Sequence, residues 1–295
     1  MTTPIFLCAD DYALTPGISR GIRELAQAGR LSATSVMTVS PYWETEGNLL
    51  TSCEPNVSGT FAGGARQPLS IGLHFTLTDY KPLTNMYDLA PSGRFPALGS
   101  LLRTALSKKL DPDEIAGELM AQIDRFEAVM GMPPAYIDGH HHVHQLPIIR
   151  DIVIEITKDR LGPTTFVRTC NEPLIAILRR GVAVPRAALI SLLGRTFARQ
   201  ARHQGLRGNR GFRGVRNFDP KEDVAHLFEA YLTRPEPKMM IMCHPGFDEP
   251  VPDVDDEIHA RRPEELAFLA SDAFARLMKE KDVELVPFSA TALPV

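Results

Sequence analysis

The feature that most constrains the fold is the regular alternation of short apolar runs with stretches of helical periodicity. The apolar runs are mostly continuous, as expected for strands that are buried on both faces of a parallel sheet. Seven runs are predicted as strands: 5–9, 34–39, 70–75, 135–138, 165–168, 239–243 and 283–287. Such a sheet can be open or closed, and about seven β–α units in 295 residues favour a closed form. We therefore predict an α/β fold, a distorted or incomplete (β/α) TIM-like barrel, with residues 1–295 forming one domain.

The clearest helix is predicted over 112–130. Asp111 is suited to cap its first turn, Pro112 fits position N1, and Gly131 can end it in the left-handed conformation. Its apolar residues share one face: Ile115, Leu119, Ile123, Phe126 and Met130. Further helices are predicted over 17–28, 148–159, 221–232 and 263–280. Residues 59–64 and 79–100 are predicted as loops.

The composition excludes several classes of protein. A net charge of −4 argues against a dedicated nucleic-acid-binding protein. The four scattered cysteines form no CxxC pair and indicate neither a disulfide scaffold nor a cysteine-rich zinc site. The first apolar run is too short for a signal peptide, and no apolar stretch reaches the length of about 18 residues that a transmembrane helix needs. We therefore expect a cytoplasmic protein.

Residues 171–216 differ from the rest of the chain in charge. They contain ten arginines, no lysine and one acidic residue, Glu172, a local charge of +9, whereas the remainder carries 22 basic and 35 acidic residues, or −13. Two interpretations stay open: a solvated helical insertion that covers the barrel, or a lid that binds anionic lipid or a phosphate-bearing substrate. The second would bring the protein into peripheral contact with the inner membrane. A homodimer is compatible with the sequence, which carries no signal for or against one.

Residues capable of chemistry lie at the ends of four predicted strands. Asp10 and Asp11 follow the first strand, His74 lies in the third, DGHHHVH (138–144) continues the fourth, and His244 follows the run 239–243. In parallel α/β folds, active sites form at the carboxyl ends of the strands. We therefore expect these residues to meet in one site.

The histidines and paired carboxylates predict a metal centre. Two adjacent carboxylates at the end of a buried strand are costly without a cation nearby. Carboxylate and imidazole together suit a divalent ion, and three protein ligands with an open position would activate a water. A spare carboxylate and a spare imidazole would then act as base and acid, so the residues predict metal-assisted hydrolysis without naming the bond. From spacing alone, His144 could replace His74 as a ligand, because His140 and His144 are four residues apart.

Several motifs occur in a characteristic order: ADDYALTPGISRGI, SATSVMTV, GLHFTLT, DGHHHVHQLP and MCHPG, followed by HARRPEELAFL. Over almost the whole chain, the sequence thereby resembles the YdjC-like family, the ChbG/HpnK carbohydrate deacetylases. This resemblance implies a distorted TIM-like barrel that removes N-acetyl groups from amino sugars with one divalent metal ion, Mg²⁺ or Zn²⁺. It further implies that Asp11, His74 and His140 hold the metal, that Asp10 is the general base and that His244 is the general acid.

The sequence departs from the family pattern at two places. Tyr12-Ala13 stands where Phe-Gly is common, and the arginine-rich segment 171–216 resembles the hopanoid-associated type more than the chitooligosaccharide type. The expected substrate is therefore an acetylated amino sugar in either an oligosaccharide or a glycolipid. Arg168 and His144 are candidates for substrate binding, although a structural salt bridge for Arg168 and a supporting position behind the metal for His144 stay open. The alternative functions are hydrolysis of another amide or a phosphoester, and non-catalytic binding of a sugar or lipid.

Overall fold

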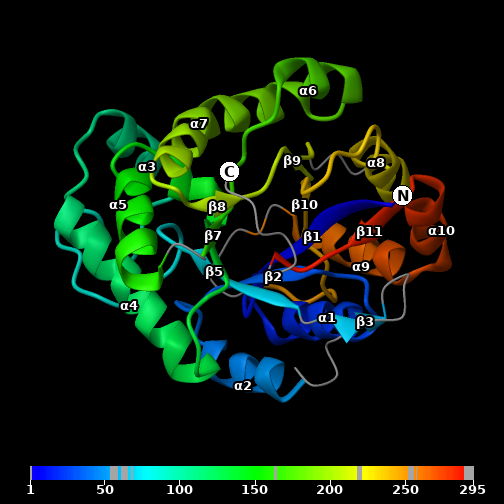
Figure 1. Ribbon diagram of the computed structural model, residues 1–295. Helices are drawn as coiled ribbons and strands as arrows, with labels where there is room; N and C mark the ends of the chain where they lie inside the picture. The colour runs from blue at the N-terminus through cyan, green and yellow to red at the C-terminus, as the bar shows by residue number, and fades with distance from the viewer. Residues whose placement is uncertain are drawn as a thin grey trace.

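The computed structural model describes residues 2–53, 59–60, 66–67, 69–162, 165–217, 221–251, 256 and 258–288. Its main sheet is built from parallel strands in the order β8-β7-β6-β5-β2-β1-β10-β9, with β11 paired to the start of β1 (Figure 1). These strands are β1 (Thr3–Tyr12), β2 (Ala33–Val36), β5 (Ser70–Phe75), β6 (Tyr136–Gly139), β7 (Phe166–Val167), β8 (Arg207–Gly208), β9 (Phe212–Arg213), β10 (Met240–Cys243) and β11 (Val283–Leu285). All seven predicted strands are present, and the incomplete TIM-like barrel is confirmed.

The two ends of the sheet, β8 and β9, belong to one extended stretch of chain, 207–213. Its beginning pairs with β7 and its end pairs with β10. Between them, the Asn209 side chain accepts a hydrogen bond from Thr169 N (2.8 Å) and donates to Thr169 O (2.8 Å) and Gly211 O (2.8 Å). Asn209 thus holds this stretch against the residues that follow β7 and brings the ends of the sheet together.

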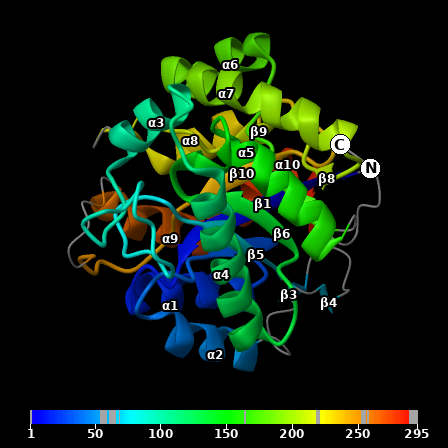
Figure 2. The same ribbon diagram turned by 90° about the vertical axis from the view of Figure 1, so that its left-hand side faces the viewer.

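Helices surround the sheet on the outside (Figures 1 and 2). They are α1 (Pro16–Gln27), α2 (Trp43–Cys53), α3 (Leu98–Leu106), α4 (Pro112–Met130), α5 (Ile149–Ile156), α6 (Leu174–Arg180), α7 (Val184–His203), α8 (Val224–Tyr231), α9 (Arg262–Ala270) and α10 (Asp272–Glu280). The helix predicted over 112–130 is confirmed with both ends: Asp111 accepts from Asp113 N and Glu114 N, and Gly131 has φ 69°. None of the described helices is both long and apolar enough to cross a membrane.

Other predicted boundaries were wrong. The helix predicted over 263–280 is two helices, because Ser271 is extended (φ −77°, ψ 160°) and its side chain accepts from Phe274 N to begin α10. The expected loop 79–100 contains the start of α3, and α2 was not predicted. Of the expected loop 59–64, residues 59–60 form β3 (Gly59–Thr60), which pairs with β4 (Arg66–Gln67), and the remainder lies outside the described residues.

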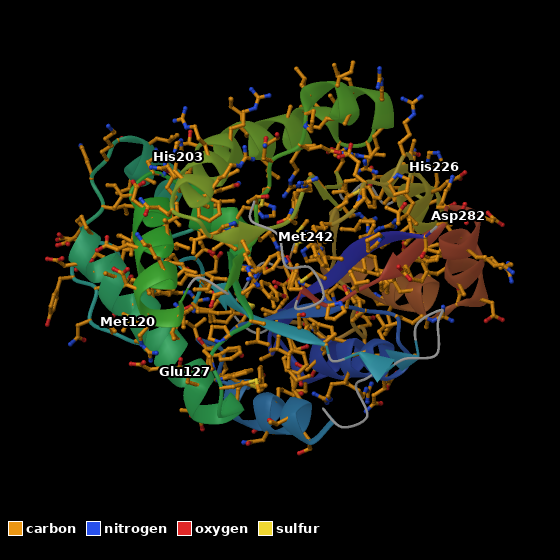
Figure 3. The ribbon with its side chains drawn as sticks, in the orientation of Figure 1. Met120, Glu127, His203, His226, Met242 and Asp282 are labelled. Atoms are coloured by element: carbon orange, nitrogen blue, oxygen red, sulfur yellow. The ribbon has the colours of Figure 1, made fainter. Side chains whose placement is uncertain are left out.

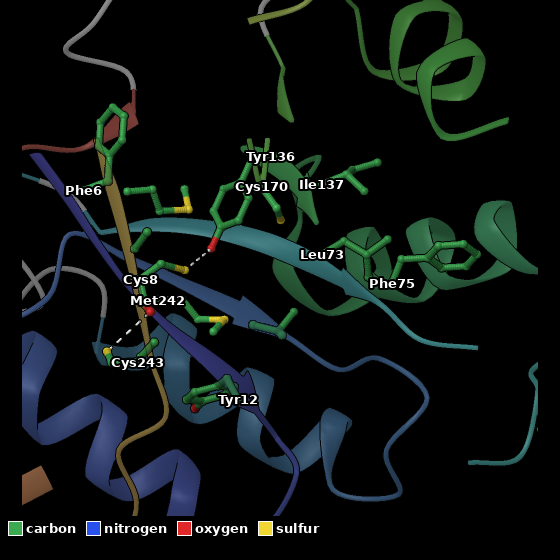
Figure 4. Packing of buried hydrophobic residues seen from close by; sticks show 14 of the residues in the cluster. Phe6, Cys8, Tyr12, Leu73, Phe75, Tyr136, Ile137, Cys170, Met242 and Cys243 are labelled. Atoms are coloured by element: carbon green, nitrogen blue, oxygen red, sulfur yellow. Dashed lines mark hydrogen bonds between the residues drawn. The ribbon is translucent and has the colours of Figure 1, made fainter. Parts of the chain in front are cut away.

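The interior below the carboxyl ends of the strands is filled by apolar and aromatic side chains (Figure 4). Tyr136 reaches across from β6 to β1, where its hydroxyl lies 3.0 Å from Cys8 Sγ. Gly72 makes room for this ring, because a Cβ at that position would lie 2.4 Å from the Tyr136 ring. Burial raises the pKa of the Cys8 thiol, so this sulfur is a neutral part of the core. The barrel interior is therefore a packed floor beneath the polar residues at its mouth.

We expect Asn209→Ala to lower the free energy of unfolding by about 3 kcal/mol, because it leaves buried backbone groups at Thr169 and Gly211 without partners. Urea unfolding followed by circular dichroism measures this loss. Asn85→Ala, at an exposed position of the described chain, is the control and should change stability little. Equal effects of the two substitutions would contradict the closing role of Asn209.

Candidate metal centre

Two adjacent aspartates face the barrel mouth because β1 is irregular where they lie. The pairing of β1 with β2 shifts register between Ala9 and Tyr12, and Asp11 adopts a left-handed backbone (φ 66°). Side chains normally alternate between the two faces of a strand, and a bulge breaks that alternation. Both carboxylates are therefore buried at the site, each 2% exposed.

Asp11, His74 and His140 converge on one point. Asp11 Oδ1 lies 3.4 Å from His74 Nε2 and 3.1 Å from His140 Nδ1, and one potential ligand atom of each residue lies within 4.8 Å of the others. The other ring nitrogen of His74 lies 2.6 Å from Asp138 Oδ1. A histidine held this way by a carboxylate presents its free nitrogen to a metal in a fixed orientation.

The charged groups around this point stabilise a cation. Burial alone lowers the pKa of His74, but Asp138, Asp10 and Asp11 outweigh it and raise the pKa to about 10. Burial raises the pKa of Asp11, but Arg262 and the two histidines hold it well below its usual range. The imidazole of His74 thus holds a proton strongly between anionic groups, and a divalent ion bound there would replace this proton. One carboxylate and two imidazoles are a suitable donor set for such an ion.

Arg168 occupies the space beside Asp10. Its guanidinium donates to both oxygens of Asp10 (2.6 and 2.5 Å) and lies 2.5 Å from Asp138 Oδ2. Cys8, Asp10 and Asp138 also lie close enough to hold a metal, but this guanidinium already supplies the positive charge there. All of these groups are buried, so Asp10 is fixed in orientation next to the candidate metal ligands.

The histidine run is not an α-helical turn. His141 (φ 53°) and His142 (φ 59°) both have a left-handed backbone inside the 3-10 segment His140–Gln145. His144 therefore points away from His140: its Nε2 donates to Arg168 O (3.0 Å), and its ring packs edge-on against Phe197. Among the described residues, its Nδ1 has no hydrogen-bond partner. The group that could hold a metal contains His74 and does not contain His144.

His244 follows β10 and is anchored by its backbone, which donates to Glu265 Oε2 (2.6 Å). Glu265 is in turn held by Arg216 (2.7 Å). Burial lowers the pKa of His244 below its ordinary value, and the negative charges of Asp11 and Asp10 offset this only in part. The imidazole therefore lies within the electrostatic reach of both aspartates.

Three residues of this site were not assigned from the sequence. Arg262 on α9 donates to Asp11 Oδ2 (2.7 Å) and to Asp256 Oδ2 (2.7 Å). Asp138 positions His74, and Glu265 positions the backbone of His244. The motif HARRPEELAFL carries Arg262 and Glu265, and DGHHHVH carries Asp138. Both motifs were visible, but nothing in them indicated which side chain each residue contacts.

The fold and the site define an α/β barrel with a buried carboxylate–imidazole centre at the carboxyl ends of its strands. The chain belongs to the YdjC-like family, since the family model described as "YdjC-like protein" matches residues 4–280. It is similar to the protein named "Chitooligosaccharide deacetylase" of Yersinia pestis (strain Pestoides F), with 36% identity over 162 residues that cover 54% of this chain and 58% of that protein. The protein of the same name from Yersinia pseudotuberculosis serotype O:1b (strain IP 31758) matches with the same identity and coverage.

The matched region spans little more than half the length of these relatives. A solved structure covers more of the chain: that of the "putative cellobiose-phosphate cleavage protein" of Enterococcus faecalis V583. It has 20% identity and a TM-score of 0.70, and the match covers 99% of this chain and 100% of that one. At this identity the likeness establishes the fold.

We expect purified wild-type protein to hold a divalent metal ion and His140→Ala to lose it, with affinity lowered by more than about 100-fold. Elemental analysis after dialysis, together with competition against a chelating dye, measures both. The control is His226→Ala, an exposed histidine on α8 at the periphery of the molecule (Figure 3), which should retain the metal. Full metal content in His140→Ala would exclude His140 as a ligand.

The raised pKa of His74 predicts a pH dependence of stability in the metal-free protein. Because the folded pKa is about 10 and the unfolded value is 6.5, His74 stabilises the fold fully below pH 6.5 and loses this contribution as the pH rises toward 10. Urea unfolding of chelator-treated protein across this range should show the loss. His74→Gln should have a shallower slope, and an unchanged slope would contradict the contribution of His74.

Proposed function

We propose that the protein is a carbohydrate deacetylase that uses a divalent metal to hydrolyse the N-acetyl group of an amino sugar. The observation that carries this proposal is the cluster Asp11–His74–His140 beside a second, immobilised carboxylate, Asp10, in a chain of the YdjC-like family. The relatives named chitooligosaccharide deacetylase support an acetylated amino sugar as the substrate. When bound, the metal supplies Lewis acidity that polarises a carbonyl and makes a water more acidic.

Asp10 is proposed as the general base. Its carboxylate accepts the proton of the attacking water while the water oxygen forms a bond to the acetyl carbon. Both of its oxygens receive hydrogen bonds from Arg168, which supports a fixed orientation throughout the reaction. Arg168 is itself buried and surrounded by Asp10, Asp138, Cys8 and Ser35, which supports a positioning role in preference to contact with the sugar.

His244 is proposed as the general acid. An amide nitrogen leaves poorly as an anion, so it needs a proton as the C–N bond breaks, and the products are acetate and the free amine. Burial outweighs the charges of Asp11 and Asp10 and lowers the pKa of His244, which makes its protonated form a stronger acid toward the leaving nitrogen. The backbone anchor to Glu265 leaves the ring of His244 available for this transfer.

The test is acetate release from short N-acetylated chitooligosaccharides and from a lipid-linked acetylated amino sugar, with metal restored to chelator-treated protein. We expect Asp10→Asn and His244→Ala to lower turnover by about 10²–10⁴-fold while keeping the metal, because each removes a proton-transfer group. His226→Ala and Asp113→Asn, both exposed, are the matched controls and should keep activity.

Retained activity in Asp10→Asn or His244→Ala would refute the role of that residue. Release of phosphate from sugar phosphates, with no acetate from any acetylated amino sugar, would refute the proposed reaction. Metal content and melting temperature of each variant separate loss of chemistry from loss of the metal or the fold.

A further inference from the structure

The exposed surface of α6 and α7 is unusually apolar. Among the described residues, nine large hydrophobic side chains are exposed, and five of them lie on these two helices: Leu174, Ile175, Leu178, Leu189 and Leu192. The two helices pack together on the side of the molecule opposite α2 (Figures 1 and 2). We call the outward-facing residues of 174–203 the α6–α7 surface. Exposed apolar residues gathered in this way mark an interaction site.

Helix α7 has two of its leucines on the solvent side. Its inward stripe consists mostly of small residues, Ala187, Ser191, Gly194, Ala198 and Ala201, together with Phe197. Close packing enforces this choice, because a Cβ on Gly194 would lie 2.7 Å from Gln145 Oε1 and 3.1 Å from the backbone of Cys170. Leu189 and Leu192, which are 54% and 60% exposed, face outward instead. Val184, Ile190 and Leu193 are partly buried and pack against the core, so α7 carries apolar side chains both toward the core and on its solvent side.

The charge of the α6–α7 surface is uniformly positive. Residues 173–216 contain no Asp or Glu. The one acid of the basic segment, Glu172, is buried and paired with Arg180 and Arg213. In the part of the chain that the structure describes, the exposed arginines Arg179, Arg195, Arg199 and Arg202 have no anionic partner. The surface therefore combines apolar side chains with unneutralised guanidinium groups.

We propose that the α6–α7 surface docks onto the surface of an anionic phospholipid bilayer. Leucine and isoleucine beside arginine suit the boundary between headgroups and acyl chains, where the apolar groups are buried and the arginines meet lipid phosphates. A nucleic acid would leave the leucines unused, and the surface presents no aromatic side chain on which bases stack. A second copy in two-fold contact would bring arginine against arginine. An anionic bilayer can bury the apolar side chains and pair with the arginines at the same time.

The proposed docking surface adjoins the candidate metal centre. Gln145, at the end of the histidine run, donates to Ile190 O (3.4 Å), and Phe197 packs against His144. Helix α7 thus packs directly against the 3-10 segment His140–Gln145. Docking is nevertheless independent of which bond is hydrolysed, and its test needs no turnover assay.

The test is flotation of the full chain with vesicles of phosphatidylcholine alone and of phosphatidylcholine mixed with phosphatidylglycerol. We expect binding to the anionic vesicles only, weakened by added salt. Leu189→Ser with Leu192→Ser should lower the partition coefficient by about tenfold or more, and Arg195→Glu with Arg199→Glu by about tenfold or more. The matched control is Leu49→Ser with Arg276→Glu, one exposed leucine and one exposed arginine on α2 and α10.

Several outcomes would overturn the docking. They are absence of vesicle binding, equal binding to neutral vesicles, or equal loss in the control variant. Tighter binding of an oligonucleotide that the leucine substitutions leave unchanged would assign the surface to nucleic acid. A dimer in sedimentation velocity that the leucine substitutions dissociate, without vesicle binding, would assign it to a second copy.

Discussion

The buried guanidinium of Arg168 is the interaction on which the rest of the site depends. It lies at the end of β7, is fully buried, and joins Asp10 on β1 to Asp138 on β6. A buried charge of this kind is tolerated only when it is paired, so a neutral group in place of either aspartate leaves Arg168 with one anionic partner in place of two. Asp138 in turn orients His74, which faces Asp11. The ion pair between Arg168 and Asp138 therefore sets the geometry of the candidate metal ligands. A second buried arginine, Arg262 on α9, holds Asp11 in the same way from outside the barrel.

The sequence predicted the strands well because each buried parallel strand is a continuous apolar run, whatever its partners are. It did not predict β8 and β9, since residues 207–213 (RGNRGFR) have no apolar run at all. Their pairing depends on Asn209 and on the edges that β7 and β10 leave open, which are properties of the assembled barrel. The split at Ser271 has the same origin, because a serine inside a helical pattern becomes a cap only when the chain turns there.

The location of the site could be predicted, but its internal contacts could not. Strand ends converge in any parallel barrel, which brings Asp11, His74 and His140 together as expected. Asp10 and Arg168 are 158 residues apart, and no local pattern indicates that they form an ion pair. The His140–His144 spacing indicates two ligands only on a regular helix, and the left-handed His141 and His142 remove that regularity. The position of His144 against Phe197 follows from this change of backbone.

Charge links the two proposals made for this protein. A net charge of −4 hides an acidic body and the +9 segment, and the fold separates them further, because it buries Glu172 between two arginines. The same helix, α7, presents small residues to the histidine run and leucine and arginine to solvent. Val184, Ile190 and Leu193 of α7 pack against the core, whereas the close approach at Gly194 leaves room only for a small residue where the helix meets Gln145 and Cys170. Leu189 and Leu192 are exposed outside these contacts, and a bilayer that accepts both them and the arginines would hold the protein by the helix that adjoins its candidate metal centre.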